Sequence, residues 1–249
     1  MDDGFQEYET GAEILMPSLA EKYAAKQRKR RKRAFSRKIL PILVAICILL
    51  ALGLSGLLSG FQHSASLDRG WNLILVNYEY HLPRDYTVEL TQLANGERVD
   101  SRMYPALQEM FDDMRAEGVY PIVASGYRSE EEQQMLLEEK IQQYCDQGYS
   151  PKKAREAALL RVAEPGTSEH QLGLAVDINQ EGTRSTASQV YTWLEEHAWE
   201  YGFILRYPEE KSHITGITNE PWHYRYVGQT AAEEINQRGI TLEEYLDAA

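Results

Sequence analysis

The pattern of apolar and polar positions divides the chain near residue 60. Residues 39–59, ILPILVAICILLALGLSGLLS, form a continuous apolar run without a charge. As a helix rising 1.5 Å per residue, this run would extend about 31 Å, the thickness of the hydrocarbon core of a bilayer. Beyond residue 70, apolar positions recur in short clusters between polar loops. We therefore expect a transmembrane anchor over residues 39–59, a stalk over residues 60–70 and a folded domain over residues 71–249.

Short apolar runs in the folded domain predict β-strands, and polar runs predict the loops between them. The loop signals are densest in HLPRDYTVELTQLANGERVD, residues 81–100, which contains the turn-forming pair Asn95-Gly96. The predicted strands cover residues 72–77, 119–125, 173–178, 203–207 and 222–228.

Apolar residues spaced three and four positions apart predict the helices. Two helices begin with a capping box, formed by Ser129 with Glu132 and by Thr241 with Glu244. A third begins with a serine cap and a first-turn proline at residues 150–151. The predicted helices cover residues 103–117, 129–145, 151–164 and 186–201, with one or two short ones near the C-terminus.

The unequal helices and long loops do not fit the regular βαβ units of a doubly wound sheet. The sequence therefore predicts an α+β fold, with a small, mainly antiparallel sheet and flanking helices. Cys47 lies in the expected anchor and Cys145 in the domain, so a disulfide within the domain is excluded.

The distribution of charge fixes the expected orientation of the anchor. Ten of the 26 Lys/Arg and six of the 38 Asp/Glu lie in residues 1–60, so the rest of the chain carries a net charge near −16. The basic run KQRKRRKRAFSRK, residues 26–38, directly precedes the apolar run. The positive-inside rule then places residues 1–38 in the cytoplasm and the domain outside the cell membrane.

A cleaved signal peptide is the alternative to an anchor, but it fits less well. The segment before the apolar run has 38 residues, and the run exceeds the usual length of about 7–15. We expect the basic tail to contact anionic lipid headgroups. Nucleic acid is not an expected partner, because the domain is acidic and the basic tail adjoins the membrane. No pattern in the sequence predicts an oligomeric state.

Asp177 is the first indication of a metal site. It lies in the run GLAVDI, where Leu174, Val176 and Ile178 would share one face of a strand and Asp177 the other. A carboxylate in an interior strand is costly unless it is paired or binds a metal. The residues alone leave two roles open, a metal ligand or a buried ion pair, and His170 just before the strand is a second candidate ligand.

The other candidates lie in EPWHYRYV, residues 220–227. Glu220 and His223 would share a helix face, but Pro221 disfavours a helix there. In a straight strand the two side chains would point to opposite faces, so a bend at Pro221 is needed to bring them together. His63, His81, His197 and His213 have no comparable pattern and are expected to lie outside the site.

Five segments resemble the VanY-type D-alanyl-D-alanine carboxypeptidases, which are zinc peptidases of the bacterial cell wall. The resemblance covers about residues 71–228, with the motifs in the order found in the family. They are LILVN (73–77), SGYRS (125–129), SEHQLGLAVDI (168–178), YGFILRYP (201–208) and ITGITNEPWHYRYVG (214–228).

The resemblance implies a role for each matching residue. His170, Asp177 and His223 would bind Zn²⁺, and Glu220 would be the catalytic base. Arg128 would contact the substrate and the developing oxyanion, or alternatively form only a structural ion pair. Substrate contacts are also implied for Gln133, with Gln134 as the alternative register, and for Ser168 and Trp222. Glu169 is the rival base, although its position next to His170 should direct it away from the metal.

The implied activity is removal of the C-terminal D-alanine from peptidoglycan stem peptides. Two alternatives stay open at this stage. One is an L,D-carboxypeptidase acting on tetrapeptide stems, because related enzymes share the metal residues. The other is a non-catalytic zinc domain that binds the cell wall, against which the presence of Glu220 argues.

Overall fold

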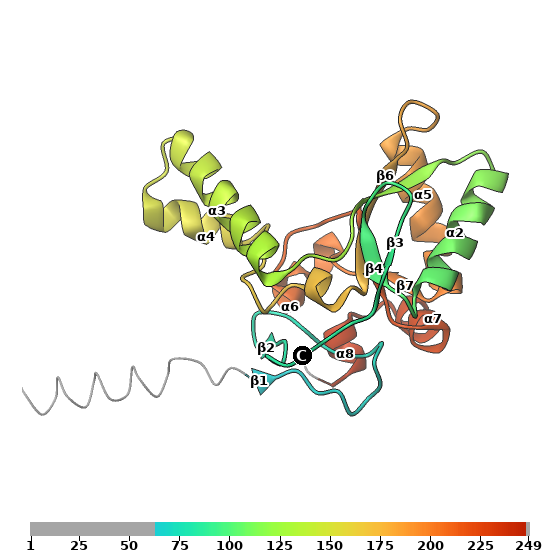
Figure 1. Cartoon of the computed structure of the whole chain (residues 1–249), viewed down its shortest axis with the longest axis horizontal. Coiled ribbons are helices and arrows are strands. Elements are labelled where there is room, and N and C mark those ends of the chain that lie inside the picture. Colours follow the sequence, from blue (N-terminus) through green and yellow to red (C-terminus); the bar gives the residue numbers. More distant parts are fainter. Residues whose placement is uncertain (1–62, 248–249) are drawn as a thin grey trace, which may run out of the picture. The chain divides into compact units, whose positions relative to one another are not determined.

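An antiparallel sheet of four strands forms the centre of the fold. The computed structural model describes residues 63–247, shown in Figure 1. The strand order is β5-β6-β8-β7, and each neighbouring pair is antiparallel. The strands are β5 (Pro121–Ser125), β6 (Ala175–Gln180), β7 (Phe203–Leu205) and β8 (His223–Tyr226). This confirms the predicted small antiparallel sheet with flanking helices.

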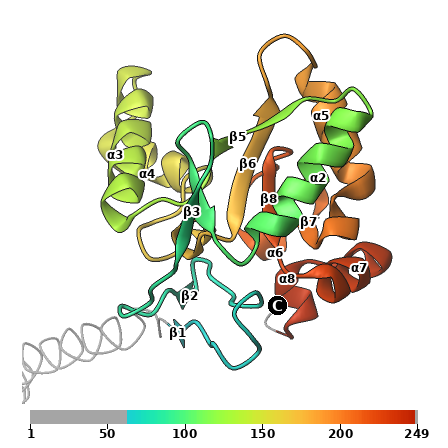
Figure 2. The same cartoon turned by 45° about the vertical axis from the view of Figure 1, so that its right-hand side comes forward.

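Two helices cover one face of this sheet and form the main core with it. The helices are α2 (Tyr104–Ala116) and α5 (Ala187–His197). Both contribute apolar side chains to one buried cluster that also contains Leu174, Val176 and Ile178. The predicted alternation along β6 is therefore confirmed, since its apolar positions face the core and Asp177 points to the other side. Figures 1 and 2 show α2 and α5 together on one side of the strands.

A second pair of helices, α3 (Glu130–Asp146) and α4 (Pro151–Leu159), forms a hairpin away from this core. In both views the hairpin lies on the opposite side of the fold from α2 and α5 (Figures 1 and 2). It has a small apolar cluster of its own, made by Leu137, Ala158 and Val162. The hairpin is thus a distinct packing unit beside the sheet.

The C-terminal segment packs on the far edge of the sheet. Its helices are α7 (Gln229–Arg238) and α8 (Leu242–Tyr245), which share a buried cluster with Ile204 of β7 and with Leu75. The remaining short helices are η1 (Glu169–Leu172), η2 (Ala198–Tyr201), η3 (Glu209–Lys211) and α6 (Ser212–Thr215).

Both predicted capping boxes are present. The Ser129 side chain accepts a hydrogen bond from the backbone N–H of Glu132, and the Glu132 carboxylate accepts one from Ser129 in return. Thr241 and Glu244 make the same exchange at α8. Each box satisfies two backbone donors that a helix N-terminus leaves free.

The predicted strand at residues 72–77 is wrong. Ile74, Leu75 and Val76 are buried, but the segment pairs with no strand in the described part of the chain. Its carbonyls instead accept hydrogen bonds from a buried guanidinium: Arg225 Nη2 lies 3.1 Å from the oxygen of Asn72 and 2.8 Å from that of Ile74. A side chain on β8 thus replaces the neighbouring strand that the apolar run would otherwise need.

The expected loop at residues 81–100 contains a small hairpin instead. Its strands are β3 (Leu90–Gln92) and β4 (Arg98–Asp100), joined around Asn95-Gly96. Two-residue strands β1 (His63–Ser64) and β2 (Tyr80–His81) pair in parallel, and Ala65 is buried in the main core. Residues 63–65 of the expected stalk are therefore packed against the domain.

The predicted anchor, residues 39–59, and the basic tail, residues 1–38, lie outside the described residues. Among residues 63–247, no helix combines the length and the apolar character needed to cross a membrane.

Candidate metal centre and active site

His170 is fixed by a short helix that ends at a glycine. It lies on η1, and Gly173 directly after that helix has φ +74°, a conformation that side chains with a Cβ rarely adopt. A Cβ at Gly173 would also lie 3.1 Å from the backbone nitrogen of Asp100. His170 Nδ1 is 2.7 Å from the carbonyl oxygen of Gly126. Because a carbonyl only accepts, Nδ1 carries the proton and Nε2 has a free lone pair.

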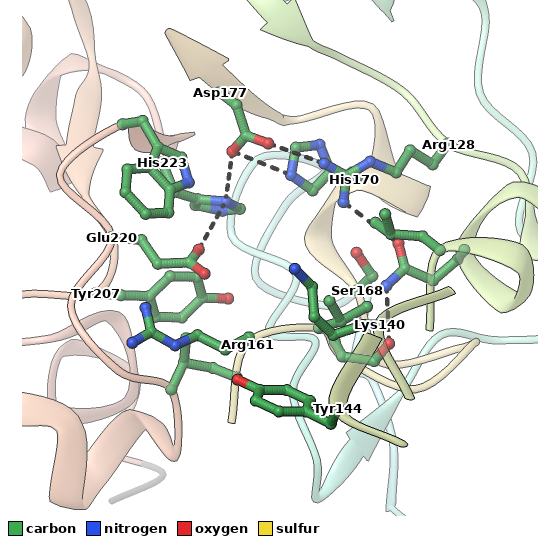
Figure 3. Close-up of a pocket in the computed structure, with 16 residues that line it drawn as sticks. Arg128, Lys140, Tyr144, Arg161, Ser168, His170, Asp177, Tyr207, Glu220 and His223 are labelled. Atoms are coloured by element: carbon green, nitrogen blue, oxygen red, sulfur yellow. Dashed lines mark hydrogen bonds and ion pairs between the residues drawn. The ribbon is translucent and has the colours of Figure 1, made fainter. Parts of the chain in front are cut away.

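Asp177 and His223 lie opposite each other on the neighbouring strands β6 and β8. They are direct partners in the register of β6 with β8, so their side chains share one face of the sheet. Asp177 Oδ1 lies 3.2 Å from His223 Nδ1 and 3.4 Å from His170 Nε2. Figure 3 shows the Asp177 carboxylate between the two imidazoles.

These three side chains fit a zinc ion. Their ligand atoms all lie within 4.8 Å of one another, and Asp177 Oδ1 is buried without a hydrogen-bond partner in the described part of the chain. Zinc–ligand bonds of 2.0–2.2 Å in a tetrahedron place ligand atoms about 3.4 Å apart. The two distances to Oδ1 agree with that spacing, so a cation at this point would satisfy the unpaired oxygen.

The electrostatics of the metal-free site also favour a cation. Burial raises the pKa of Asp177, but the contacts with His170 and His223 outweigh it and hold this pKa well below its usual range. Burial lowers the pKa of His223, yet the nearby carboxylates of Asp177 and Glu169 raise it overall to about 9. A protonated His223 thus balances the carboxylates, and metal binding would release that proton.

Glu220 reaches the site through the bend expected at Pro221. Residues 220–223 form a turn in which the His223 N–H donates to the Glu220 carbonyl at 3.0 Å, with proline at its second position. The turn brings Glu220 Oε2 to 3.7 Å from His223 Nδ1. Burial, opposed by the nearby positive charge of His223, raises the pKa of Glu220 to about 7. A carboxyl group with such a pKa is suited to exchanging protons at neutral pH.

Arg128 both forms an ion pair and lines the cavity. Its Nη2 donates to Asp177 Oδ2 at 2.8 Å and its Nε donates to Ser125 Oγ at 2.9 Å. Asp177 thereby directs one oxygen to Arg128 and the other to the two histidines. The ion pair is therefore present and leaves Arg128 in the cavity wall, where its contact with substrate stays a prediction.

A cavity of about 460 Å³ opens over the three candidate ligands. The metal candidates, Glu220 and the residues expected to contact substrate all contribute to its wall. Gln133 is buried, and its Oε1 lies 3.4 Å from Arg128 Nη1, whereas Gln134 is exposed and bonded to Glu138. Gln133 is therefore the residue that faces the site. Ser168 and Trp222 also line the cavity, as expected.

Part of the wall was not expected from sequence. Lys140 and Tyr144 on α3, Arg161 just after α4 and the buried Tyr207 line the cavity as well. In Figure 3 Lys140 and Arg161 lie on the side away from Asp177. Helical periodicity indicates which side of α3 is apolar, but not that this helix stands beside the metal ligands.

The other candidates lie elsewhere. Within residues 63–247, no further histidine joins the group of three, and His197 is a surface residue bonded to Glu200. The carboxylate of Glu169 does not line the cavity. It points behind His223 toward Arg206 and Arg225, so it is not placed to act as the base.

Comparison with known proteins identifies the family of the chain. The family model for "VanY: D-alanyl-D-alanine carboxypeptidase" matches residues 96–229. A D-alanyl-D-alanine carboxypeptidase of Enterococcus faecalis is 56% identical over 180 residues, covering 72% of this chain and 67% of the relative.

Two solved structures are similar over nearly their whole length. VanYB in complex with D-alanine-D-alanine has 57% identity and a TM-score of 0.71, covering 72% of this chain and 98% of that one. A mutant of the vancomycin resistance D,D-pentapeptidase VanY in complex with Zn(II) has 58% identity and a TM-score of 0.70, covering 71% and 99%. Together with the family match, these similarities show that the chain belongs to the VanY family of D-alanyl-D-alanine carboxypeptidases.

Proposed function

We propose that this protein is a zinc-dependent carboxypeptidase that removes the C-terminal D-alanine from peptidoglycan stem peptides ending in D-Ala-D-Ala. The observation that carries the proposal is the placement of Glu220 beside His170, Asp177 and His223 in one cavity. Relatives named for D-Ala-D-Ala cleavage, and one with D-alanine-D-alanine bound, support the substrate class.

His170 Nε2, His223 Nδ1 and one oxygen of Asp177 are the proposed zinc ligands. When bound, zinc polarises the scissile carbonyl and lowers the pKa of water to about 7. Glu220 takes a proton from the attacking water and delivers it to the amine of the leaving D-alanine. Its raised pKa, about 7 in the metal-free protein, suits both steps, because the carboxylate must accept the proton and then release it.

Arg128 is the proposed electrostatic stabiliser. Its guanidinium is permanently charged and is fixed by Asp177 and Ser125, so it needs little reorganisation when negative charge develops on the carbonyl oxygen. Gln133 keeps the outer side of this guanidinium in place while its Nε2 donates to the carbonyl of Ala163 at 2.8 Å. Ser168 and Trp222 complete the proposed substrate contacts.

The choice of stem peptide tests the proposal. We expect the full-length protein loaded with zinc to release D-alanine from a pentapeptide stem ending in D-Ala-D-Ala at least about tenfold faster than from the tetrapeptide stem, measured as kcat/KM by D-alanine release. A reversed preference would identify an L,D-carboxypeptidase instead. Zinc binding without release from either peptide would favour the non-catalytic wall-binding domain.

We also propose that residues 39–59 anchor the protein in the cell membrane, with residues 1–38 in the cytoplasm and the domain outside. The basic residues 26–38 would then lie against anionic lipid headgroups. Fractionation of cells expressing the protein should recover it in membranes washed with high salt, and added protease should degrade the domain in intact spheroplasts. Recovery of a shortened protein from the medium would support a cleaved signal peptide.

A further inference from the structure

A group of buried charges lies behind the metal site. Glu169, Arg206 and Arg225 have side chains with no exposed surface, and the Glu243 side chain is 3% exposed. Arg206 donates to Glu243 through both terminal nitrogens, at 3.0 and 2.6 Å. Two glutamates and two arginines balance one another, which is the condition under which charges are stable in a protein interior.

The two oxygens of Glu169 have different surroundings. Oε1 accepts hydrogen bonds from Arg206 Nε and Arg225 Nη1, each at 2.8 Å. Oε2 is buried and lies 3.5 Å from Nε2 of His223. Neither Oε2 nor this Nε2 has a hydrogen-bond partner elsewhere in residues 63–247. A buried donor and a buried acceptor thus face each other, with no competing contact.

We propose that Glu169 is a positioning residue for zinc binding: its Oε2 accepts a hydrogen bond from His223 Nε2–H when the metal is bound. This contact would keep the proton on Nε2, so that the lone pair of Nδ1 points to the metal. A carboxylate behind a ligand histidine is a common arrangement in zinc sites, where it fixes the tautomer and the ring orientation. The inference rests on the proposed zinc ligands but not on peptide cleavage.

Arg206 and Arg225 fix the orientation of the Glu169 carboxylate. Because Oε1 is held by two guanidinium groups, Glu169 cannot rotate without breaking both contacts, and Oε2 stays aimed at His223. Arg206 is itself held by Glu243 on α8, whose Oε1 also accepts from Asn77 Nδ2 at 3.1 Å. Glu243 and Asn77 thus act on Arg206 alone, whereas Arg225 holds Oε1 of Glu169 independently of them, and neither Glu243 nor Asn77 lines the cavity.

The test compares two variants of the full-length protein, Glu169→Gln and Glu243→Gln. Each removes one negative charge from the same buried group, but only Glu169 faces His223. The zinc dissociation constant is measured by competition with a chelator, and the stability of the metal-free protein by thermal unfolding. We expect Glu169→Gln to weaken zinc binding about 10–100-fold. Glu243→Gln should destabilise the metal-free protein at least as much and weaken zinc binding far less.

Two outcomes would overturn the proposal: zinc binding by Glu169→Gln as tight as in the parent, or equal weakening in both variants. If Glu169→Gln does not fold, NMR of the zinc-loaded parent protein with ¹⁵N-labelled histidine tests the contact instead. A hydrogen-bonded Nε2–H of His223 should give a downfield proton signal. Absence of that signal would equally count against the contact. These readouts do not involve turnover, so an inactive protein that passes them would contradict only the proposed function.

Discussion

Replacing Glu220 by glutamine is expected to lower kcat about 10²–10⁴-fold while the protein continues to bind zinc. The amide has nearly the shape of the carboxyl group, but it cannot accept a proton from water or deliver one to the leaving amine. Glu220 is not one of the three side chains whose ligand atoms converge, so the metal should remain. The measurements are D-alanine release and zinc content of the purified variant.

The matched control is Glu210→Gln, an exposed glutamate that does not line the cavity. It removes the same charge and should leave kcat within about twofold of the parent. A Glu220→Gln variant that retains zinc and turns over at a similar rate would show that another group transfers the proton.

Glu220→Gln should also be more stable than the parent protein when both are free of metal and at alkaline pH. The folded protein raises the pKa of Glu220 from 4.5 to about 7, so between these values the folded state binds more protons than the unfolded state. Stability contributed by this group is therefore present below about pH 4.5 and is lost as the pH rises through 7. A shift of this size corresponds to about 3 kcal/mol at most, and glutamine does not titrate.

Unfolding by urea in the presence of a chelator should therefore show an advantage of about 2–3 kcal/mol for Glu220→Gln at pH 8 and almost none at pH 4. An advantage that does not change with pH would mean that the carboxyl group is not destabilised by burial. The ionised base thus costs the metal-free fold stability, and we expect zinc to offset that cost.

Replacing Asp177 by asparagine should abolish both zinc binding and activity. The substitution removes the negatively charged ligand and also the partner of Arg128, which would then face the metal position as an uncompensated cation. The loss of zinc affinity should exceed the 10–100-fold loss caused by replacing a residue that only hydrogen-bonds to a metal ligand. The variant should contain little zinc after purification, and D-alanine release should fall below detection.

His197→Gln is the control for the loss of a polar side chain outside the site. His197 is paired with Glu200 on the surface, and the variant should keep full zinc content and activity. Circular dichroism of the metal-free Asp177→Asn protein would separate loss of the metal from loss of the fold. A folded Asp177→Asn protein with one zinc per chain would contradict the ligand set.

Part of the candidate metal site was predictable from local signals in the sequence. Asp177 is a carboxylate in an apolar strand, a pattern that is stable only with a partner. The restricted backbone before and at Pro221 permits a bend without requiring it, and in the structure this bend places Glu220 beside His223. The resemblance to a family then joined segments that local patterns leave separate.

The parts that were not predictable depend on contacts between distant segments. Residues 72–77 have the composition of a strand, yet two of their carbonyl groups accept hydrogen bonds from Arg225, about 150 positions later in the chain. The pairing of Asp177 with His223 depends on the register of β6 and β8, which no local pattern specifies. Glu169 looked like a rival base because it adjoins His170, whereas its place behind His223 follows from Arg225 on β8 and from Arg206 just after β7.

The hairpin of α3 and α4 has a consequence for how this enzyme could diversify. It supplies Gln133, Lys140 and Tyr144 to the cavity wall, while the proposed zinc ligands and Glu220 belong to η1, β6, β8 and the turn before β8. Its small core is separate from the core beneath the sheet. Substitutions of Lys140 or Tyr144, which contact neither Arg128 nor the proposed zinc ligands, are therefore expected to alter which peptide is accepted without moving the groups proposed to hydrolyse it.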